Sequence, residues 1–471
     1  MTEETATPPD AAGSATRAAP VTTDRSERVG WYFYDWANSA FYTTGVTVFL
    51  GPYLGSIANT AAGCTSDADL DAGCPGKFVH PFGLDVAPGS FFAYTVSLSV
   101  FLTVFVLPVV GAIADRSPRK KVLLAVSAYI GAAATVGMVF LTGSRYLLGG
   151  LLLLIANIAL GASIVVYNSF LPQISSPDDR DAVSSRGWAF GYLGGGLLLL
   201  FNVIAVFVGD AVGWDTGNVA RWSIVSAGVW WAGFTLIPLR RLRDRPPLAG
   251  AVGGASVITA GFKQLWETLR SLKAFPLTLF FLIAYLIYND GIQTVISLAA
   301  VYGTEQLKLA NTVLVPTILM VQFLAFVGAL SLGALARRIG AWKTVLASLV
   351  LWIVVLIAAY FLPAHQAIPF IVLGAGIGLV LGGSQALSRS LFSQLIPPGK
   401  EGEYFGLYEI SDKGTSWLGP LVFGLSYQAT GNYRVAIISL VAFFVIGFVA
   451  LLCVPIRRAV EQAGNVPPRV L

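Results

Sequence analysis

The sequence predicts an all-α polytopic membrane protein in which twelve transmembrane helices form two six-helix bundles related by a pseudo-two-fold axis. Composition indicates this class, because 55% of the 471 residues are apolar and only 12% are charged. Apolar runs of about 20 residues, the length that crosses a hydrocarbon core, also recur along the whole chain. The expected spans are 29–54, 90–114, 121–142, 147–172, 187–209, 221–239, 275–302, 312–336, 344–362, 368–395, 404–428 and 434–456.

The lysine and arginine residues favour one orientation of these spans. With the N-terminus in the cytoplasm, most of the 30 basic residues fall on the cytoplasmic side, as the positive-inside rule requires. We therefore expect a multi-pass protein of the cytoplasmic membrane with both termini in the cytoplasm. The same distribution accounts for the net charge of +5, so the sequence predicts no nucleic-acid partner.

Changes in composition suggest where the bundles begin and end. Residues 1–28 lack an apolar signal-peptide core and are rich in Ala, Thr, Pro and Ser, which predicts a disordered tail. Residues 256–273 place apolar side chains on one helical face, as expected for an amphipathic interfacial helix or, equally, for a solvated linker helix. The expected units are a cytoplasmic tail (1–28), an N-terminal bundle (29–239), a cytoplasmic linker (240–274), a C-terminal bundle (275–456) and a second tail (457–471).

An internal repeat relates the two expected bundles. Gly161-Ala-Ser163 matches Gly382-Gly-Ser384 at an offset of 221 residues, and the loop beginning at Gly111 matches the loop beginning at Gly333 at an offset of 222. Helix 4 then corresponds to helix 10, and loop 2–3 to loop 8–9. The sequence therefore predicts two parallel repeats.

The first expected span carries a stripe of polar side chains. Its members stand at positions i, i+3, i+4 and i+7, which share one face of a helix. They are Asp35, Asn38, Ser39 and Tyr42. Because a charged or amide group at bilayer depth is costly unless it faces protein or a water-filled cavity, we expect this stripe to face a cavity.

The seventh expected span repeats this pattern, acid for acid, amide for amide and hydroxyl for hydroxyl. The members are Asp290, Gln293, Thr294 and Ser297. Asp290 lies near the midpoint of its span, whereas Asp35 lies about seven residues, roughly 10 Å, nearer the cytoplasmic end of its own span. Either helix 1 begins earlier than residue 29, or the match is partly chance.

Further polar candidates lie in other expected spans. Glu409 and Lys413 stand at i and i+4 on helix 11, where they could form a structural ion pair or a coupling site. Arg389 lies two turns from a cytoplasmic helix end, so we expect it to extend to lipid headgroups and not to bind substrate. The other candidates are Tyr167, Asn168, Asn289, Gln385, Tyr408 and Asp412.

Residues 111–121, GAIADRSPRKK, resemble the signature loop of the major facilitator superfamily, G-x-x-x-D-R-x-G-R-[KR], with Pro118 in place of its second glycine. A glycine there permits close helix approach, and an acid can accept hydrogen bonds at a helix N-terminus. The resemblance implies that the loop latches the inward-closed state. The alternative is an ordinary basic loop. The gating residues would be Gly111, Asp115, Arg116 and Arg119.

Four stretches narrow the resemblance to the vacuole-effluxer-like branch of that superfamily. They are residues 34–41, 167–172, 288–294 and 382–393. The fungal relatives in this branch are autophagy-related permeases that export amino acids from the vacuole, and the resemblance covers nearly the whole chain. The resemblance implies the major facilitator fold but leaves the substrate open.

The expected function is secondary transport of a small solute by alternating access, with proton-coupled efflux. A zwitterionic amino acid would suit the polar residues, with its ammonium near Asp35 or Asp290 and its carboxylate near amides, tyrosine hydroxyls or Lys413. The expected partners are the solute, the proton and membrane lipid, and the expected state is a monomer. Two alternatives remain open: a facilitator or drug-type exporter, and a non-transporting membrane scaffold or receptor.

The sequence carries no nucleotide-binding or catalytic signature. A Walker A stretch, a zinc-type Cys/His spacing and a nucleophile elbow are all missing from it, so we expect no enzyme, no cofactor and no metal site. Cys64 and Cys74 share the long external loop. They could form a disulfide in an oxidising compartment or remain two free thiols.

Overall fold

The computed structural model describes residues 24–64, 75–247, 270, 272–413 and 418–471. Within these ranges the chain is helical, and its β pairing is one isolated bridge between Val79 and Val86. The expected amphipathic helix at 256–273 lies almost entirely outside the described residues, as does the tail through residue 23.

The N-terminal bundle begins with three helical segments in continuous succession, α1, η1 and α2. Its elements are α1 (Arg25–Ala40), the π-helical η1 (Phe41–Phe49), α2 (Leu50–Ala61), α4 (Phe91–Arg116), α5 (Lys120–Gly137), η4 (Met138–Phe140), α6 (Tyr146–Asn168), α7 (Leu171–Ile174), α8 (Arg180–Ala211) and α9 (Thr216–Arg241). Two short 3₁₀ turns, η2 (Pro81–Gly83) and η3 (Pro88–Ser90), precede α4.

The C-terminal bundle has the same kind of long antiparallel helices. Its elements are η5 (Leu272–Ala274), α11 (Pro276–Val301), the π-helical η6 (Tyr302–Gln306), α12 (Asn311–Ile339), α13 (Ala341–Tyr360), α14 (Ala367–Gln394), α15 (Glu401–Lys413), α16 (Leu418–Thr430), α17 (Tyr433–Ser439) and α18 (Val441–Leu452). A short helix, α19 (Ile456–Gln462), follows it.

These helices correspond to the twelve expected spans. Ten of them, within the described residues, are long and apolar enough to cross a membrane. The other two expected spans are the first, which is divided into α1, η1 and α2, and the eleventh, which is described as α15 and α16. Helix ends follow local signals: Asp24 caps α1 by accepting a hydrogen bond from the Ser26 amide at 2.8 Å, and a proline opens α11.

The first span begins earlier than the sequence analysis expected, at Arg25 instead of residue 29, and continues well past residue 54. The reason is that charged residues in its first turn have protein partners. The buried carboxylate of Glu27 accepts a hydrogen bond from Arg245 Nη2 at 2.7 Å, so the polar turn before the apolar run is held against the bundle.

The distribution of side chains on α4 is that of a lipid-facing helix. Phe101 and Phe105 are 59% and 48% exposed, whereas Ser99 and Thr103 are buried. In water this arrangement would be unfavourable, but lipid solvates aromatic side chains and leaves small polar residues for helix contacts. The pattern supports placement of this bundle in a membrane.

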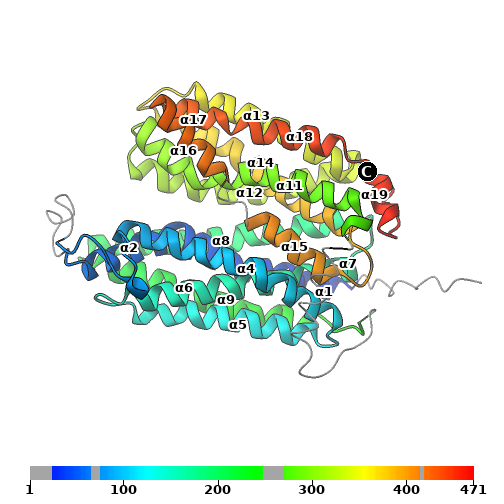
Figure 1. The fold of residues 1–471 in the computed structure, drawn as a ribbon, viewed down its shortest axis with the longest axis horizontal. Coiled ribbons are helices and arrows are strands. Elements are labelled where there is room, and N and C mark those ends of the chain that lie inside the picture. The colour runs from blue at the N-terminus through cyan, green and yellow to red at the C-terminus, as the bar shows by residue number, and fades with distance from the viewer. Residues whose placement is uncertain (1–23, 65–74, 248–269, 271, 414–417) are drawn as a thin grey trace, which may run out of the picture.

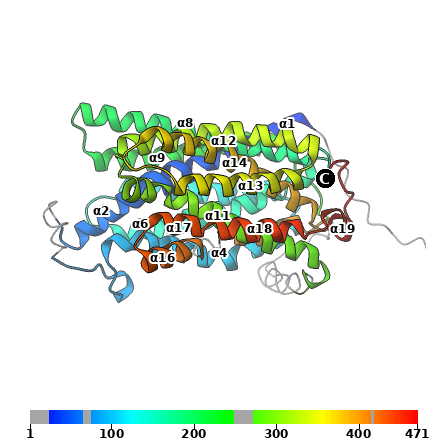
Figure 2. The same ribbon diagram turned by 90° about the horizontal axis from the view of Figure 1, so that it is seen from above.

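The two bundles lie side by side with their helices roughly parallel to one long axis (Figures 1 and 2). The most extensive contacts between them are α4 against α15 and α8 against α12, and α8 also lies against α14 and α6 against α15. Figure 1 places the start of α1, α7, α15 and α19 at one end of the molecule, which we call the terminal side.

Candidate functional site

The hydrogen bonds described between the bundles lie in the half of each spanning segment nearest the terminal side. They join Asp115 to Gly402 and Glu403, Asn168 to Glu409, Pro177 to Gln394, Arg180 to Ser393, Asp181 to Ser390, Ser184 to Ala386, Tyr192 to Gln385, and Arg389 to Asp35, Asn168 and Ser184. At the surface, Arg469 near the C-terminus also contacts Asp178. These contacts close the molecule at its terminal side.

Arg389 of α14 is the central residue of this interface. Its guanidinium is 3% exposed and contacts Asp35 of α1, with 3.2 Å from Nη1 and 3.3 Å from Nη2 to the same carboxylate oxygen. Nη1 also donates to Asn168 Oδ1 at 3.3 Å, and Nε and Nη2 donate to the hydroxyl and carbonyl oxygens of Ser184, both at 3.0 Å. The expectation that Arg389 extends to lipid headgroups is wrong, because acceptors of the N-terminal bundle surround it.

Three aromatic rings enclose the same guanidinium. Its carbon atom lies 4.7 Å from the ring centroid of Trp31, 5.4 Å from that of Trp188 and 5.7 Å from that of Tyr167, within the range of cation–π attraction. Trp31 and Tyr167 stack on each other with centroids 4.4 Å apart. We call Trp31, Asp35, Tyr167, Asn168, Ser184 and Trp188 the guanidinium cage.

Asp35, the acid of the helix 1 stripe, lies inside this cage. In addition to Arg389, it accepts a hydrogen bond from the Tyr167 hydroxyl at 2.7 Å. Gly187 of α8 makes the approach possible, because a Cβ there would lie 2.8 Å from the Asp35 carboxylate and 3.0 Å from Arg389 Nη2. The buried acid therefore has the partners that its cost of burial requires.

Asn168 connects the cage to α15. Its Nδ2 donates to Glu409 Oε1 at 3.0 Å while its Oδ1 accepts from Arg389. Asn168 and Arg389 are 221 residues apart, which is the offset of the internal repeat. The repeat therefore brings equivalent positions of helices 4 and 10 into contact across the pseudo-two-fold axis.

The space beyond the cage, away from the terminal side, is lined by polar side chains of both bundles. The Tyr192 hydroxyl donates to Gln385 Oε1 at 2.8 Å and bridges α8 and α14. Tyr42, two turns beyond Asp35 on the same stripe, is 47% exposed and lies within range of the charge on Asp412 in the other bundle. Tyr42 is therefore a partly exposed residue of the stripe that lies near the other bundle.

Asp412 belongs to a separate network inside the C-terminal bundle. It accepts hydrogen bonds from the Tyr285 hydroxyl at 2.7 Å and from Asn289 Nδ2 at 2.9 Å. The side chain of Lys413, its neighbour on α15, lies outside the described part of the chain. The expected pairing of Lys413 with Glu409 is therefore not described.

Two residues of the expected stripes, one from each, make hydrogen bonds within their own helix. Asn38 Nδ2 donates to the Tyr34 carbonyl of its own helix at 2.7 Å, and Asn38 is buried. Gln293 is half-buried, and its carbonyl accepts from Ser297 one turn later. Neither side chain has a described hydrogen bond to the guanidinium cage.

Asp290 lies on a different face of α11 from Asn289. Its backbone packs against Gly419 of α16, whose amide also interacts with its buried carboxylate, and no side chain of the described residues bonds that carboxylate. Asn289 instead faces Asp412 in the bundle interior. Because one residue rotates a side chain by about 100° around a helix, the acid-for-acid match between the stripes of helices 1 and 7 does not place Asp290 and Asp35 in a common network.

This contrast gives a stability prediction. Asp290→Asn should leave the melting temperature of the purified protein unchanged or higher, since a buried carboxylate without a side-chain partner costs more than an amide in the same place. Asp35→Asn should lower it, because hydrogen bonds to a charged group contribute about 1.5–3 kcal/mol each. Thermal unfolding in detergent, followed by tryptophan fluorescence, compares the two. If both variants lose the same number of degrees in melting temperature, Asp35 and Asp290 do not differ in their stabilising partners.

The loop of residues 111–121 forms a second contact between the bundles. The two carboxylate oxygens of Asp115 accept hydrogen bonds from the amides of Gly402 and Glu403, at 2.7 and 2.9 Å, at the N-terminus of α15. Lys120 Nζ lies 3.5 Å from the same carboxylate. This is the helix-capping interaction that the sequence predicted for Asp115.

The other residues of the loop differ in their surroundings. A Cβ at Gly111 would overlap the carbonyl oxygen of Gly402, so glycine is required for the close contact of α4 and α15. Arg116 is half-buried, and its Nε has no hydrogen-bond partner among the described residues. Arg119 is exposed at the start of α5. In the external loop, Cys64 is disulfide-bonded, Cys74 lies outside the described residues, and Cys453 is free.

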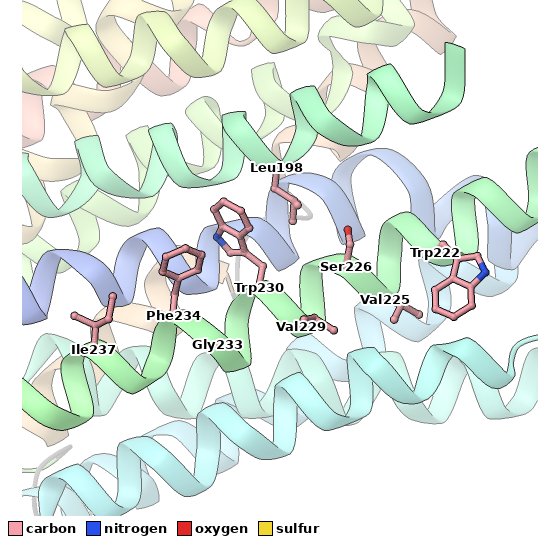
Figure 3. A pocket seen from close by; sticks show the side chains of 9 residues that line it. All are labelled: Leu198, Trp222, Val225, Ser226, Val229, Trp230, Gly233, Phe234 and Ile237. Atoms are coloured by element: carbon pink, nitrogen blue, oxygen red, sulfur yellow. The ribbon is translucent and has the colours of Figure 1, made fainter. Parts of the chain in front are cut away.

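A groove of about 670 Å³ lies on the N-terminal bundle, apart from the cage (Figure 3). Its lining is mostly aliphatic and aromatic, and two of its polar side chains have partners: Ser226 bonds Asn202, and Trp230 Nε1 donates to the Trp36 carbonyl. The lining residues are Leu198 of α8 and Trp222, Val225, Ser226, Val229, Trp230, Gly233, Phe234 and Ile237 of α9. With these two side chains satisfied, the groove suits apolar chains, as a lipid-facing surface does.

Sequence reasoning identified half of the cage, namely Asp35, Tyr167 and Asn168. Trp31, Trp188 and Ser184 stood outside the candidates, and Arg389 was assigned to the headgroups. The internal repeat is the one signal that points to Arg389, because its offset of 221 residues makes Arg389 the equivalent of the candidate Asn168.

Comparison with known proteins places this geometry in a family context. Residues 23–464 match the family model described as vacuole effluxer Atg22 like. The chain is 27% identical over 442 residues to an uncharacterised MFS-type transporter, YxiO, of Bacillus subtilis, with coverage of 93% of this chain and 97% of that protein. It is 28% identical over 548 residues to autophagy-related protein 22-1 of Penicillium rubens, covering 94% and 92%.

A solved structure supports the fold. The major facilitator superfamily proton:xylose symporter XylE superimposes with a TM-score of 0.64 at 13% identity, covering 91% of this chain and 94% of that one. At this identity the likeness concerns the arrangement of helices alone.

Proposed function

Because the chain belongs to the Atg22-like vacuole effluxer family and is a multi-pass secondary transporter of the major facilitator superfamily, we propose that it exports an amino acid or similar small solute in exchange for protons. The terminal side is then cytoplasmic, as the distribution of basic residues predicts. On this orientation the contacts at the terminal side would close the cytoplasmic side, and the exposed Tyr42 would lie on the path from the opposite side.

The observation that carries this proposal is the Asp35–Arg389 pair, which joins α1 of one bundle to α14 of the other at 3.2 Å. Alternating access requires contacts that exist in one state and break in the other. A buried carboxylate and guanidinium from opposite bundles form such a contact. Neither can remain buried alone at moderate cost, so opening must supply each with another partner.

The same pair supports coupling of transport to protons. When α14 moves away, Asp35 loses its guanidinium partner, and a proton can take its place. For an exchange, this proton enters from the opposite side as the bundles open toward the cytoplasm, and it leaves to the cytoplasm when the solute binds. The substrate would bind in the polar space near Tyr42, Tyr192 and Gln385, next to the cage.

Transport by Asp35→Asn tests this function. Purified protein in liposomes should transport radiolabelled amino acids faster when a pH gradient is imposed. In Asp35→Asn, this gradient-driven rate should be at least tenfold lower. Asp210→Asn, which changes an exposed acid at the far end of α8, is the matched control and should transport normally. Unchanged proton-linked transport by Asp35→Asn would rule out the coupling role.

A further inference from the structure

We propose that the guanidinium cage is a binding site for a cation carried by the cargo, a guanidinium or alkylammonium group, and that Arg389 occupies it when no cargo is bound. The transported solute would then be a basic amino acid or a similar cation. This inference rests on the proposed transport function and specifies its substrate class.

The first observation is the origin of the cage residues. Arg389 belongs to α14 in the C-terminal bundle, whereas its described hydrogen-bond acceptors, Asp35, Asn168 and Ser184, belong to α1, α6 and α8. The three rings around it also come from the N-terminal bundle. The cage therefore belongs to one bundle and its occupant to the other.

The second observation is the chemistry of the cage. Every polar atom that it directs at Arg389 is an acceptor: a carboxylate, an amide oxygen, a hydroxyl and a carbonyl. A guanidinium is a planar group with donors only, so the match is complete. Aromatic faces that surround a cation next to a carboxylate are the usual means by which proteins bind ligand ammonium and guanidinium groups.

Space also restricts the occupant. Gly187 lines the cage so closely that a Cβ there would contact the Trp31 ring, the Asp35 carboxylate and Arg389 Nη2. Gly191, one turn later, packs in the same way against Ser39 and Asp35. These glycines leave room for a flat or slender cation between the rings.

Opening at the terminal side must empty the cage. As α14 separates from α1, α6 and α8, the guanidinium leaves and the acceptors and rings face the opening. A cation from the cytoplasm would restore the lost contacts, so binding of a basic solute would favour the open state. Arg389 and the cargo cation would thus compete for one site.

Chemical rescue of Arg389→Ala tests the proposal. Methylguanidinium at millimolar concentration should raise the melting temperature of purified Arg389→Ala by several degrees, whereas the neutral analogue methylurea should not. The double variant Asp35→Asn, Arg389→Ala should show no response to methylguanidinium. Equal responses to the charged and neutral compounds, or a response that survives in the double variant, would overturn the proposal.

A second measurement keeps Arg389 in place and covers the case in which Arg389→Ala does not fold. Gly111→Ala, which should hold the terminal side open, should bind free arginine at least tenfold more tightly than citrulline, its neutral counterpart. Equal binding, or none, would overturn the proposal. Proton-linked transport of neutral amino acids alone by the wild-type protein would also overturn it but leave the proposed transport function intact.

Discussion

Arg389→Ala should shift the protein strongly toward the state that is open at the terminal side. The substitution removes the partner of a carboxylate, Asp35, whose side chain is 13% exposed, and leaves the cage acceptors unpaired. Removing one member of a buried ion pair costs about 3–5 kcal/mol. Since the contact exists only in the closed state, we expect the ratio of closed to open molecules to fall roughly a hundredfold or more.

Cysteine labelling measures this shift. Ser393, buried at the bundle interface next to Arg180, bonds its hydroxyl to its own helix, so Ser393→Cys is a conservative reporter in a Cys453→Ser background. An impermeant maleimide should label the reporter slowly in the parent and quickly after Arg389→Ala.

The matched control for this experiment is Arg28→Ala. Arg28 pairs with Asp179 at 2.8 Å inside the N-terminal bundle, so its loss removes an ion pair without touching the contact between the bundles. Labelling of the reporter should stay slow in this variant. If Arg389→Ala also labels slowly, the Asp35–Arg389 pair does not hold the closed state.

Gly111→Ala should prevent closure by another route. The backbones of α4 and α15 touch at Gly111 and Gly402, and an added methyl group would overlap a carbonyl oxygen that cannot rotate away. Forcing extra volume into a packed contact costs about 1–3 kcal/mol. It would also pull Asp115 away from the N-terminus of α15, so we expect transport to fall at least tenfold and the Ser393→Cys reporter to become accessible.

Gly424→Ala is the control for this variant. Gly424 lies on α16, and a Cβ there would meet nothing within 4 Å, so transport should be normal. Normal transport by Gly111→Ala would show that α4 and α15 can separate at this point without effect on the cycle.

Much of the fold follows from local properties of the sequence. The twelve spans, the parallel repeat and the capping role of Asp115 were all predicted, and the fold and the described contacts agree with them. The helix 1 stripe was also recognised, and Asp35 does lie at the interface between the bundles. The spans, the stripe and the Asp115 cap were accessible because each depends on residues within one helix or one loop, and the repeat was accessible because short stretches of the two halves still match.

The pairing of polar side chains was not accessible in this way. The sequence places Arg389 two turns from a helix end, within reach of lipid headgroups, and gives Asp290 the same position in its stripe as Asp35. The structure buries Arg389 among side chains more than 200 positions away, and it turns Asp290 toward α16 while Asn289 faces the interior.

The sequence by itself determined that this is a twelve-span membrane protein, because apolar length and charge asymmetry are imposed by the bilayer on each segment separately, and its internal repeat determined that the two bundles are similar. Only the tertiary structure decided that a guanidinium of one bundle fills a cage of the other. The physical reason is that such a contact depends on the rotation of each helix, about 100° per residue, and on the approach of bundles whose partner residues lie far apart in the chain.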